Sequence, residues 1–373
     1  MLGAYIHIPF CAFKCFYCDF YSCVNKTNVE QYIDAVIKEI MSEAELLSVR
    51  GINTIYIGGG TPSVIDSKYI VKLLDVLKLF ATEDVEITIE VNPESVTEQK
   101  LQDYFDAGVN RISIGLQSAN DTTLKKIGRV ATLRDFEKAY NTAVKVGFKN
   151  ISCDVMIGLP DETLDMFENT VDYILSLKNI THISAYSLEL HENTKLDFLV
   201  NNNFVSLPNE NVEREMKYML DKKLEEAGFN RYEISNYSKP RFESKHNLKY
   251  WNQEEYLGFG AAASTFVNSI RYTNIQDIDK YITNINNGTS NKQDIEEMDK
   301  LGLIKEYIIL KLRLKQGINL TEFKTKFKQD IYELYKENID KLINEGLLQK
   351  LGDNLALTYK GEDLANIVWQ EFI

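Results

Sequence analysis

The sequence predicts an α/β fold built on a parallel β-sheet, followed by a smaller C-terminal domain. Short runs rich in β-branched residues alternate with longer stretches of helical periodicity through roughly the first 230 residues. Six such strand–helix units follow one another, and glycine, proline or polar residues close several of the strands. Because this alternation is typical of parallel sheets covered by helices, we expect a partial (βα)6, TIM-like barrel, with a doubly wound open sheet as the alternative.

The expected strands and helices alternate in order along the chain. The strands occupy residues 4–9, 53–57, 85–91, 110–116, 151–157 and 182–188. The helices occupy residues 29–47, 68–80, 98–107, 133–146, 164–177 and 209–227. Ligands of parallel βα folds bind at the carboxyl ends of the strands, so we expect the segments that follow the strands to share one face.

The pattern changes after the sixth unit, and the sequence suggests three parts. Residues 1–236 form the barrel, and residues 237–290 form a connecting segment with an asparagine-rich linker at 282–288. Residues 291–373 hold two or three amphipathic helices and a short hairpin around 347–358. These features predict a small, mainly α, winged-helix-like C-terminal domain.

Composition limits the classes of function. The chain has 373 residues, of which 44% are hydrophobic and 26% charged, so it can bury more than one core. Its net charge of −13 would repel a polyphosphate, and we expect no nucleic-acid partner. No apolar run approaches the ~20 residues of a membrane span, and the N-terminus carries no export signal, which predicts a cytoplasmic protein.

One basic stretch stands out from the acidic background. Residues 311–328 carry six Lys or Arg residues and a single acidic residue, Glu322. A solvated helix face is the simplest interpretation of this stretch, and peripheral contact with anionic lipid or a membrane partner is the alternative.

Three of the five cysteines lie within eight residues of one another. Cys11, Cys15 and Cys18 form a C-x3-C-x2-C run directly after the first expected strand, and this clustering indicates a metal. A [4Fe–4S] cluster normally takes four thiolates, so a trio leaves one iron open. A zinc ribbon would need a second cysteine pair, and Cys153 lies alone in an apolar run, where we expect a buried hydrophobic side chain.

Other candidate residues follow the later strands. A glycine-rich turn at 58–62, Gly-Gly-Gly-Thr-Pro, would let the backbone approach a ligand closely. Glu90, Gln117, Arg129 and Asp154 lie at or after the ends of expected strands. Because a charged residue in an apolar strand is costly unless it is paired or faces a cavity, the four together predict a polar ring around a cofactor.

These motifs resemble those of the radical S-adenosylmethionine (SAM) superfamily. From Tyr5 to about Asn252 the chain resembles the proteins grouped around oxygen-independent coproporphyrinogen III oxidase. The resemblance implies that Cys11, Cys15 and Cys18 ligate a [4Fe–4S] cluster. It also implies that SAM is bound by Tyr5, Tyr17, Gly59, Gly60, Thr61, Glu90, Gln117, Arg129 and Asp154. In this superfamily the reduced cluster cleaves SAM to a 5′-deoxyadenosyl radical, and the protein excludes water and oxygen.

Two features separate the branches of that family. The oxidase has a further cysteine two residues after the third ligand, whereas this chain has Phe20 there, and Cys23 is out of register and expected not to ligate. The run His246-Asn247-Leu-Lys-Tyr250-Trp251 resembles the H-N-x-x-Y-W motif of the HemW branch of heme chaperones. The resemblance implies a protein that binds heme and transfers it to acceptor hemoproteins, with the cluster and SAM assisting.

The sequence alone leaves several alternatives open. His246 is either a heme contact or a packed structural residue, and His7 is expected to be structural. An oxygen-independent coproporphyrinogen III oxidase is the second hypothesis for the function, and an RNA-modifying radical SAM enzyme is the third. The sequence leaves open whether SAM is cleaved productively, which group ligates heme iron, which hemoprotein accepts heme, and whether the chain forms a homodimer.

Overall fold

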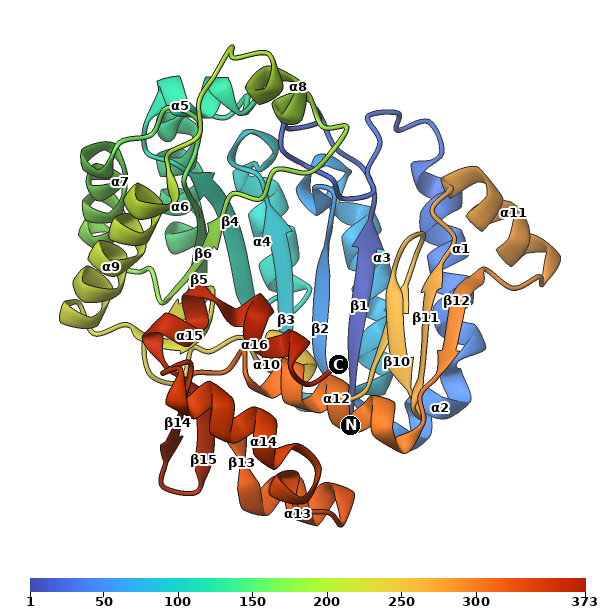
Figure 1. Cartoon of the computed structure of the whole chain (residues 1–373). Coiled ribbons are helices and arrows are strands. Elements are labelled where there is room, and N and C mark those ends of the chain that lie inside the picture. Colours follow the sequence, from blue (N-terminus) through green and yellow to red (C-terminus); the bar gives the residue numbers. More distant parts are fainter.

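Six parallel strands form the centre of a mixed twelve-stranded sheet (Figure 1). They are β1 (Leu2–Ile8), β2 (Ile52–Gly59), β3 (Ala81–Val91), β4 (Arg111–Gln117), β5 (Asn150–Ile157) and β6 (His182–Ser187). The computed structural model describes all residues, 1–373, and each of these strands pairs in parallel with the next. The predicted α/β fold with a parallel sheet is therefore confirmed.

Helices follow the parallel strands and cover the sheet. They are α1 (Val29–Ser42), α2 (Ala44–Arg50), α3 (Ser67–Leu77), α4 (Glu98–Asp106), α5 (Asp121–Lys126), α6 (Leu133–Val146), α7 (Leu164–Ser176), α8 (Lys195–Asn201) and α9 (Glu210–Glu226), with 3-10 turns η1 (Pro62–Val64), η2 (Lys78–Phe80) and η3 (Pro93–Ser95). The helix expected at 29–47 is interrupted at Glu43, and α5 and α8 were not predicted. Six or seven residues are too few to display a helical period.

Local capping explains where the best-predicted helix begins and ends. The Thr132 hydroxyl accepts the backbone N–H of Asp135, whose carboxylate in turn accepts the backbone N–H of Thr132. This reciprocal pair is a capping box. At the other end of α6, Gly147 adopts a left-handed conformation with φ of 118°.

Residues beyond the sixth unit extend the sheet at both edges. On the β6 side lie β8 (Asn236–Ser238) and β7 (Asn230–Glu233). On the β1 side lie β9 (Tyr256–Phe259), β10 (Ser264–Val267), β11 (Ile270–Asn274) and β12 (Lys292–Glu297). Helix α10 (Lys245–Trp251) precedes β9, and α11 (Ile278–Asn287) packs against α1. The residues expected to connect two domains, 237–290, thus contribute strands and helices to the main sheet and its core.

The prediction of a linker at 282–288 is wrong. Residues 282–287 form the second half of α11, and Gly288 caps this helix. Asp277 caps the start of this helix by accepting the backbone N–H of Lys280. Tyr281 is fully buried, and Ile278, Ile282 and Ile285 pack against the large core at helical spacing. The asparagines between these residues mask that spacing in the sequence.

The C-terminal domain has its own core of 17 buried residues. It consists of α12 (Lys300–Lys311), β13 (Ile318–Asn319), α13 (Leu320–Phe327), α14 (Ile331–Asn344), β14 (Leu348–Leu351), β15 (Asn354–Leu357), α15 (Tyr359–Asp363) and α16 (Ala365–Gln370). The three short strands form an antiparallel sheet in the order β13-β15-β14. Helices with a small β-hairpin match the predicted winged-helix-like domain.

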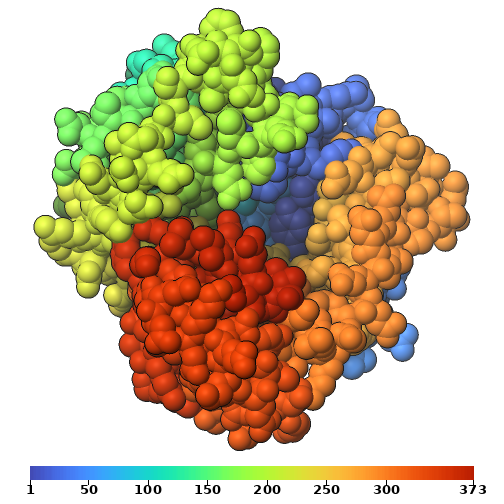
Figure 2. All heavy atoms as spheres, viewed as in Figure 1, coloured from blue at the N-terminus to red at the C-terminus, as the bar shows by residue number.

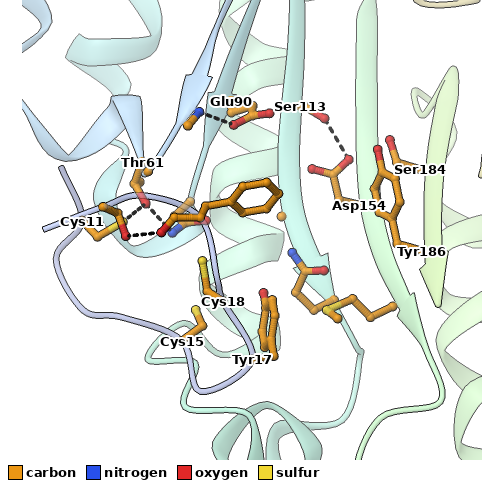
Figure 3. A pocket seen from close by; sticks show the side chains of 18 of the residues that line it. Cys11, Cys15, Tyr17, Cys18, Thr61, Glu90, Ser113, Asp154, Ser184 and Tyr186 are labelled. Atoms are coloured by element: carbon orange, nitrogen blue, oxygen red, sulfur yellow. Dashed lines mark hydrogen bonds between the residues drawn. The ribbon is translucent and has the colours of Figure 1, made fainter. Parts of the chain in front are cut away.

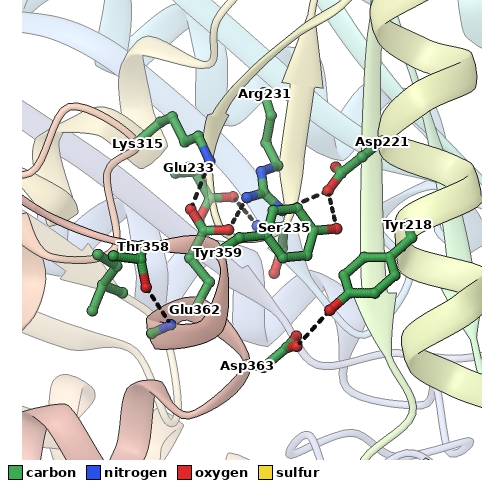
Figure 4. Close-up of polar contacts among 12 residues, drawn as sticks. Tyr218, Asp221, Arg231, Glu233, Ser235, Lys315, Thr358, Tyr359, Glu362 and Asp363 are labelled. Carbon is green, nitrogen blue, oxygen red and sulfur yellow. Dashed lines mark hydrogen bonds and ion pairs between the residues drawn. The ribbon is translucent and has the colours of Figure 1, made fainter. Parts of the chain in front are cut away.

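A polar network fastens the C-terminal domain to the barrel (Figure 4). Glu362 of α15 forms ion pairs with Arg231 of β7 and with Lys315, whose Nζ lies 2.9 Å from the carboxylate. The Tyr359 hydroxyl donates to Asp221 of α9 over 2.5 Å. The side chains of Arg231 and Glu362 are only 14% and 10% exposed, so this network is largely shielded from water.

The basic stretch 311–328 does not form the single solvated helix face that its sequence suggests. Lys311 is buried and donates to Asn252 over 2.8 Å. The guanidinium of Arg313 lies 4.4 Å from the centre of the Trp251 ring, and Lys315 is paired as described above. These three cations therefore contact other parts of the protein. No helix of the chain has both the length and the apolar character needed to cross a membrane.

Candidate functional site

A cavity of about 450 Å³ lies beneath the cysteine loop, among the strands of the parallel sheet. The lining includes all predicted cluster and SAM residues except Tyr5: Cys11, Cys15, Tyr17, Cys18, Gly59, Gly60, Thr61, Glu90, Gln117, Arg129 and Asp154. Figure 3 shows Cys15 and Cys18 on the loop facing this space, and Asp154 and Tyr186 on the strands opposite. The fold thus brings together residues that are up to 143 positions apart in the sequence, from Cys11 to Asp154.

Backbone hydrogen bonds hold the cysteine loop in place. The Cys11 N–H donates to the Cys23 carbonyl over 2.9 Å, and the Cys23 N–H donates to the Pro9 carbonyl over 2.7 Å. The Cys23 thiol instead lies 3.1 Å from the carbonyl of Asn25 and does not line the cavity. Cys23 therefore closes the base of the loop through its backbone.

The cysteine trio suits a cluster better than a single ion. All three thiols are free, yet their sulfur atoms do not converge on one point as the ligands of one metal ion do. Three thiolates of a [4Fe–4S] cluster each bind a different iron and so stand further apart. Thr61 Oγ1 lies 3.6 Å from the Cys11 sulfur and Arg129 Nη1 lies 3.9 Å from the Cys15 sulfur, and both donate toward it. Burial raises the pKa of the Cys18 thiol to about 11, so cluster binding must displace its proton.

The glycine-rich turn packs directly against the cysteine loop. The Gly60 N–H donates to the Ile8 carbonyl over 2.9 Å, and the Thr61 N–H donates to the Phe10 carbonyl over 2.8 Å. Gly59 has φ of 108°, and a Cβ added to it would lie 2.6 Å from the His7 ring. These glycines are therefore required for loop-to-loop contact, and the amides of Gly60 and Thr61 bond inside the protein.

Two carboxyl groups face the cavity from neighbouring strands. Glu90 accepts the Tyr56 hydroxyl over 2.7 Å, and burial raises its pKa to about 7. Asp154 accepts the Ser113 hydroxyl over 2.9 Å, and burial likewise raises its pKa. Because desolvation disfavours their charged forms, both groups would gain from a cationic ligand such as a sulfonium.

Arg129 is fixed between the strands and the cysteine loop. Its guanidinium donates to Asn92 Oδ1 over 3.1 Å and to the Gly115 carbonyl over 2.9 Å. Gln117 is the last residue of β4, the strand that contains Gly115. Its backbone is left-handed, with φ of 69°, although it is not glycine. Such backbone strain is concentrated at functional sites.

The sequence interpretation missed several residues that line the same cavity, among them Tyr56, Arg111, Ser113, Ser184 and Tyr186. In β4 the inward-facing positions are Arg111, Ser113, Gly115 and Gln117, which alternate with buried isoleucine and leucine. The two-residue period of a strand was thus a usable signal, because it places every second residue of β4 on the cavity side.

The four heme-binding candidates do not share one cavity. Asn247 lines the cavity beneath the cysteine loop, whereas Tyr250 and Trp251 line a second cavity of about 570 Å³. His246 is 1% exposed and lines neither of them. Its Nδ1 lies 2.9 Å from Thr54 Oγ1 and its Nε2 lies 2.7 Å from the Tyr250 hydroxyl, while burial lowers its pKa to about 3. His246 is therefore neutral, with a hydrogen-bond partner at both ring nitrogens.

The second cavity is aromatic and adjoins the cysteine loop. It is lined by Tyr5, Tyr250, Trp251, Tyr256 and Phe266, among others. Asp19 and Phe20 line both cavities, and Phe20 is 65% exposed. Figure 2 shows the molecule hollowed between the segment near residue 200, the segment near residue 275 and the C-terminal domain, with N-terminal residues at the bottom of the recess.

Comparison with known proteins agrees with this geometry. Residues 5–174 match the radical SAM superfamily, and residues 298–364 match the HemN C-terminal domain. Heme chaperone HemW of Lactococcus lactis subsp. lactis is 37% identical, with all of this chain and 97% of the relative covered. HemW of Bacillus subtilis is 35% identical with 100% and 99% covered, and HemW of Escherichia coli is 31% identical with 100% and 98% covered.

A solved structure shares the fold. Coproporphyrinogen III oxidase (HemN) from Escherichia coli, a radical SAM enzyme, superposes with a TM-score of 0.87 at 20% identity, covering 100% of this chain and 89% of the oxidase. The full-length relatives favour the heme-chaperone interpretation over the oxidase and over the RNA-modifying enzyme.

Proposed function

The chain belongs to the HemW family of heme chaperones within the radical SAM superfamily, and from that premise we propose that it binds heme and passes it to acceptor hemoproteins. In this proposal Cys11, Cys15 and Cys18 hold a [4Fe–4S] cluster, whose fourth iron is left for SAM. When bound, the cluster and SAM supply electron transfer and a potential radical source, and the chain positions them. Membrane contact through residues 311–328 and a homodimer stay predictions from the sequence.

The observation that carries the proposal is the aromatic cavity beside the cysteine loop. Its volume of about 570 Å³ falls in the range of ~300–1,000 Å³ that is typical of ligand pockets. Tyr250 and Tyr256 meet edge to face with ring centres 4.6 Å apart, and Trp251 and Phe266 add further apolar surface. Aromatic side chains of this kind offer apolar surface to the faces of a porphyrin.

Behind the wall of this cavity, His246 acts as a positioning residue for Tyr250. Ligation of heme iron by His246 would require breaking the hydrogen bond to Thr54 or the one to Tyr250 and moving the ring out of the core. A fixed imidazole, in contrast, holds the Tyr250 phenol in place at the cavity wall. His246 thus has a role at this site that needs no direct iron ligation.

The cluster lies close enough to the heme cavity to influence it. Asp19 and Phe20, which follow the third cluster cysteine directly, line both cavities. A change in cluster occupancy that shifts this loop would therefore reach the heme cavity. Phe20 stands where the oxidase branch has a cysteine, and its ring adds apolar surface at this boundary.

The central experiment is a heme titration of the anaerobically reconstituted protein, followed by the Soret band. We expect saturable binding, a loss of at least tenfold in affinity for Tyr250→Ala, and no change for Tyr218→Ala, which removes a 44% exposed tyrosine elsewhere. For His246→Ala we expect weaker binding with an unchanged spectrum of the bound heme, because the iron ligand is retained. A shifted Soret band in that variant would assign ligation to His246, and absence of saturable binding would contradict the proposal.

Two assays then separate chaperone from oxidase. Heme-loaded protein mixed with an apo-hemoprotein should transfer heme, as seen from the absorption spectrum of the acceptor. Incubation with coproporphyrinogen III, SAM and a reductant should yield no protoporphyrinogen IX. Formation of that product would restore the oxidase hypothesis.

A further inference from the structure

A charged residue that none of the roles above uses lies at the amino end of β4. Arg111 is 2% exposed, and its side chain lines the cavity beneath the cysteine loop. Its Nε–H is buried without a hydrogen-bond partner. The guanidinium forms no ion pair with any carboxylate of the chain, and it influences Glu90 and Asp154 through its charge alone. A buried cation left without a partner is costly, and an incoming anion would relieve that cost.

The second cavity arginine provides a useful contrast. Arg129 donates to Asn92, to Gly115 and toward Cys15, so its guanidinium is already engaged. Arg129 reaches β4 at Gly115, four residues beyond Arg111 and hence about 13 Å away along the strand. The cavity therefore has one satisfied arginine at the cluster end and one unsatisfied arginine at the opposite end.

We propose that Arg111 is the centre of an anion site at the floor of this cavity, which receives the carboxylate group of a ligand other than SAM. SAM bound at the open iron would lie at the cluster end of the cavity, where Arg129 donates toward Cys15, and not at Arg111. Ser184 and Tyr186 line the same cavity and offer hydroxyl donors to the same anion.

A carboxylate fits this site better than other anions. The planar guanidinium donates two parallel hydrogen bonds to a carboxylate, which a halide ion cannot accept in that geometry. A phosphate would bring up to two negative charges close to Glu90 and Asp154, which line the same cavity. Since burial already raises the pKa of both carboxyls, a single negative charge is the most that this environment accommodates.

Two sources could supply the carboxylate: a free small acid, or a propionate side chain of a heme that extends from the second cavity past Asp19 and Phe20, which line both cavities. The second source rests on the proposed function. The first probe is therefore propionate itself, titrated calorimetrically into the reconstituted, SAM-saturated chain, with chloride as the reference anion. We expect saturable binding of one propionate per chain, weakened at least tenfold by Arg111→Gln. Arg134→Gln, the same change at an exposed site of α6, should leave binding unaffected.

A second variant keeps the test decisive. Arg111→Lys retains the charge but loses the paired donors, so it should bind propionate several-fold more weakly than the wild type. Its ratio of propionate affinity to chloride affinity should be no higher than that of the wild type. Retained SAM binding in either variant demonstrates a folded cavity. Absence of saturable propionate binding to the wild type, or equal binding by Arg111→Gln, would overturn the proposal.

Heme and its dimethyl ester distinguish the two sources. If a heme propionate occupies the site, the wild type should prefer heme over the diester by about tenfold, and Arg111→Gln should abolish this preference. Equal affinity for heme and diester, together with propionate binding, would assign the site to a free acid. Failure of all heme binding would refute the proposed function while leaving the propionate result to decide the anion site.

Discussion

Substituting Glu90 should stabilise the protein while weakening its cofactor site. Burial raises the pKa of Glu90 from 4.5 to about 7, and a tenfold change in a protonation equilibrium corresponds to about 1.4 kcal/mol. The ionised carboxylate therefore costs the folded state at most about 3.5 kcal/mol, an upper bound because the group faces the cavity. Between pH 4.5 and 7 the folded state binds more protons than the unfolded state, so this contribution to stability falls as pH rises and levels off above pH 7.

Glu90→Gln removes this titration and keeps most of the local geometry. The amide oxygen can still accept the Tyr56 hydroxyl, whereas the 3.3 Å bond from the Gly59 N–H to the second carboxylate oxygen is lost, at about 1 kcal/mol. The variant should consequently be more stable than the wild type by about 2 kcal/mol at pH 8 and nearly equal to it at pH 5. The same change should lower SAM affinity at least tenfold, since the site loses a carboxylate that would face the sulfonium.

Urea unfolding of the reduced, SAM-free protein at pH 5 and pH 8 measures this difference. Glu83→Gln, at an exposed position of the same strand, is the matched control and should show no pH-dependent difference. A Glu90→Gln variant that is no more stable than the wild type at pH 8, or that differs from it equally at both pH values, would refute a destabilising charge on Glu90.

Three further outcomes follow from the packing of the loops and of the C-terminal domain. Cys15→Ala should abolish the visible absorption and the bound iron of the reconstituted protein, whereas Cys23→Ala should retain both, because Cys15 lines the cavity and Cys23 does not. Gly59→Ala should lower the free energy of unfolding by about 2–3 kcal/mol, measured in urea, because its Cβ would lie 2.6 Å from the His7 ring and its φ is 108°. Glu362→Gln should destabilise the attachment of the C-terminal domain by on the order of 3 kcal/mol, seen as faster limited proteolysis with SAM binding unchanged.

Local chemistry explains why part of the site could be predicted. Cys11, Cys15 and Cys18 lie on one loop, so their spacing alone brings the thiols together. The glycine-rich turn was equally visible, but its use was only partly anticipated, since Gly60 serves loop packing through its bond to Ile8. A motif confined to a few consecutive residues can be interpreted from the sequence, because its meaning does not depend on contacts with distant segments.

Contacts between distant segments explain the misses. Residues 282–287, expected to form a linker, are helical because isoleucines of α11 pack against the large core. The high asparagine content of the segment does not reveal this packing. The bond of His246 to Thr54 arises only when α10 packs on β2, although the bond to Tyr250 lies within α10 itself. A histidine beside aromatic residues looks the same in the sequence whether its nitrogens are free or occupied.

The sequence by itself determined the α/β class, the cysteine trio and the branch of the family, because these depend on periodicity and on short motifs. The tertiary structure decided which buried polar groups are satisfied. Arg129 and Arg111 both line the cavity, yet the fold gives one of them three acceptors and the other none. The free energy of a buried charge depends on partners that come from other strands and loops, and those partners exist only in the folded chain.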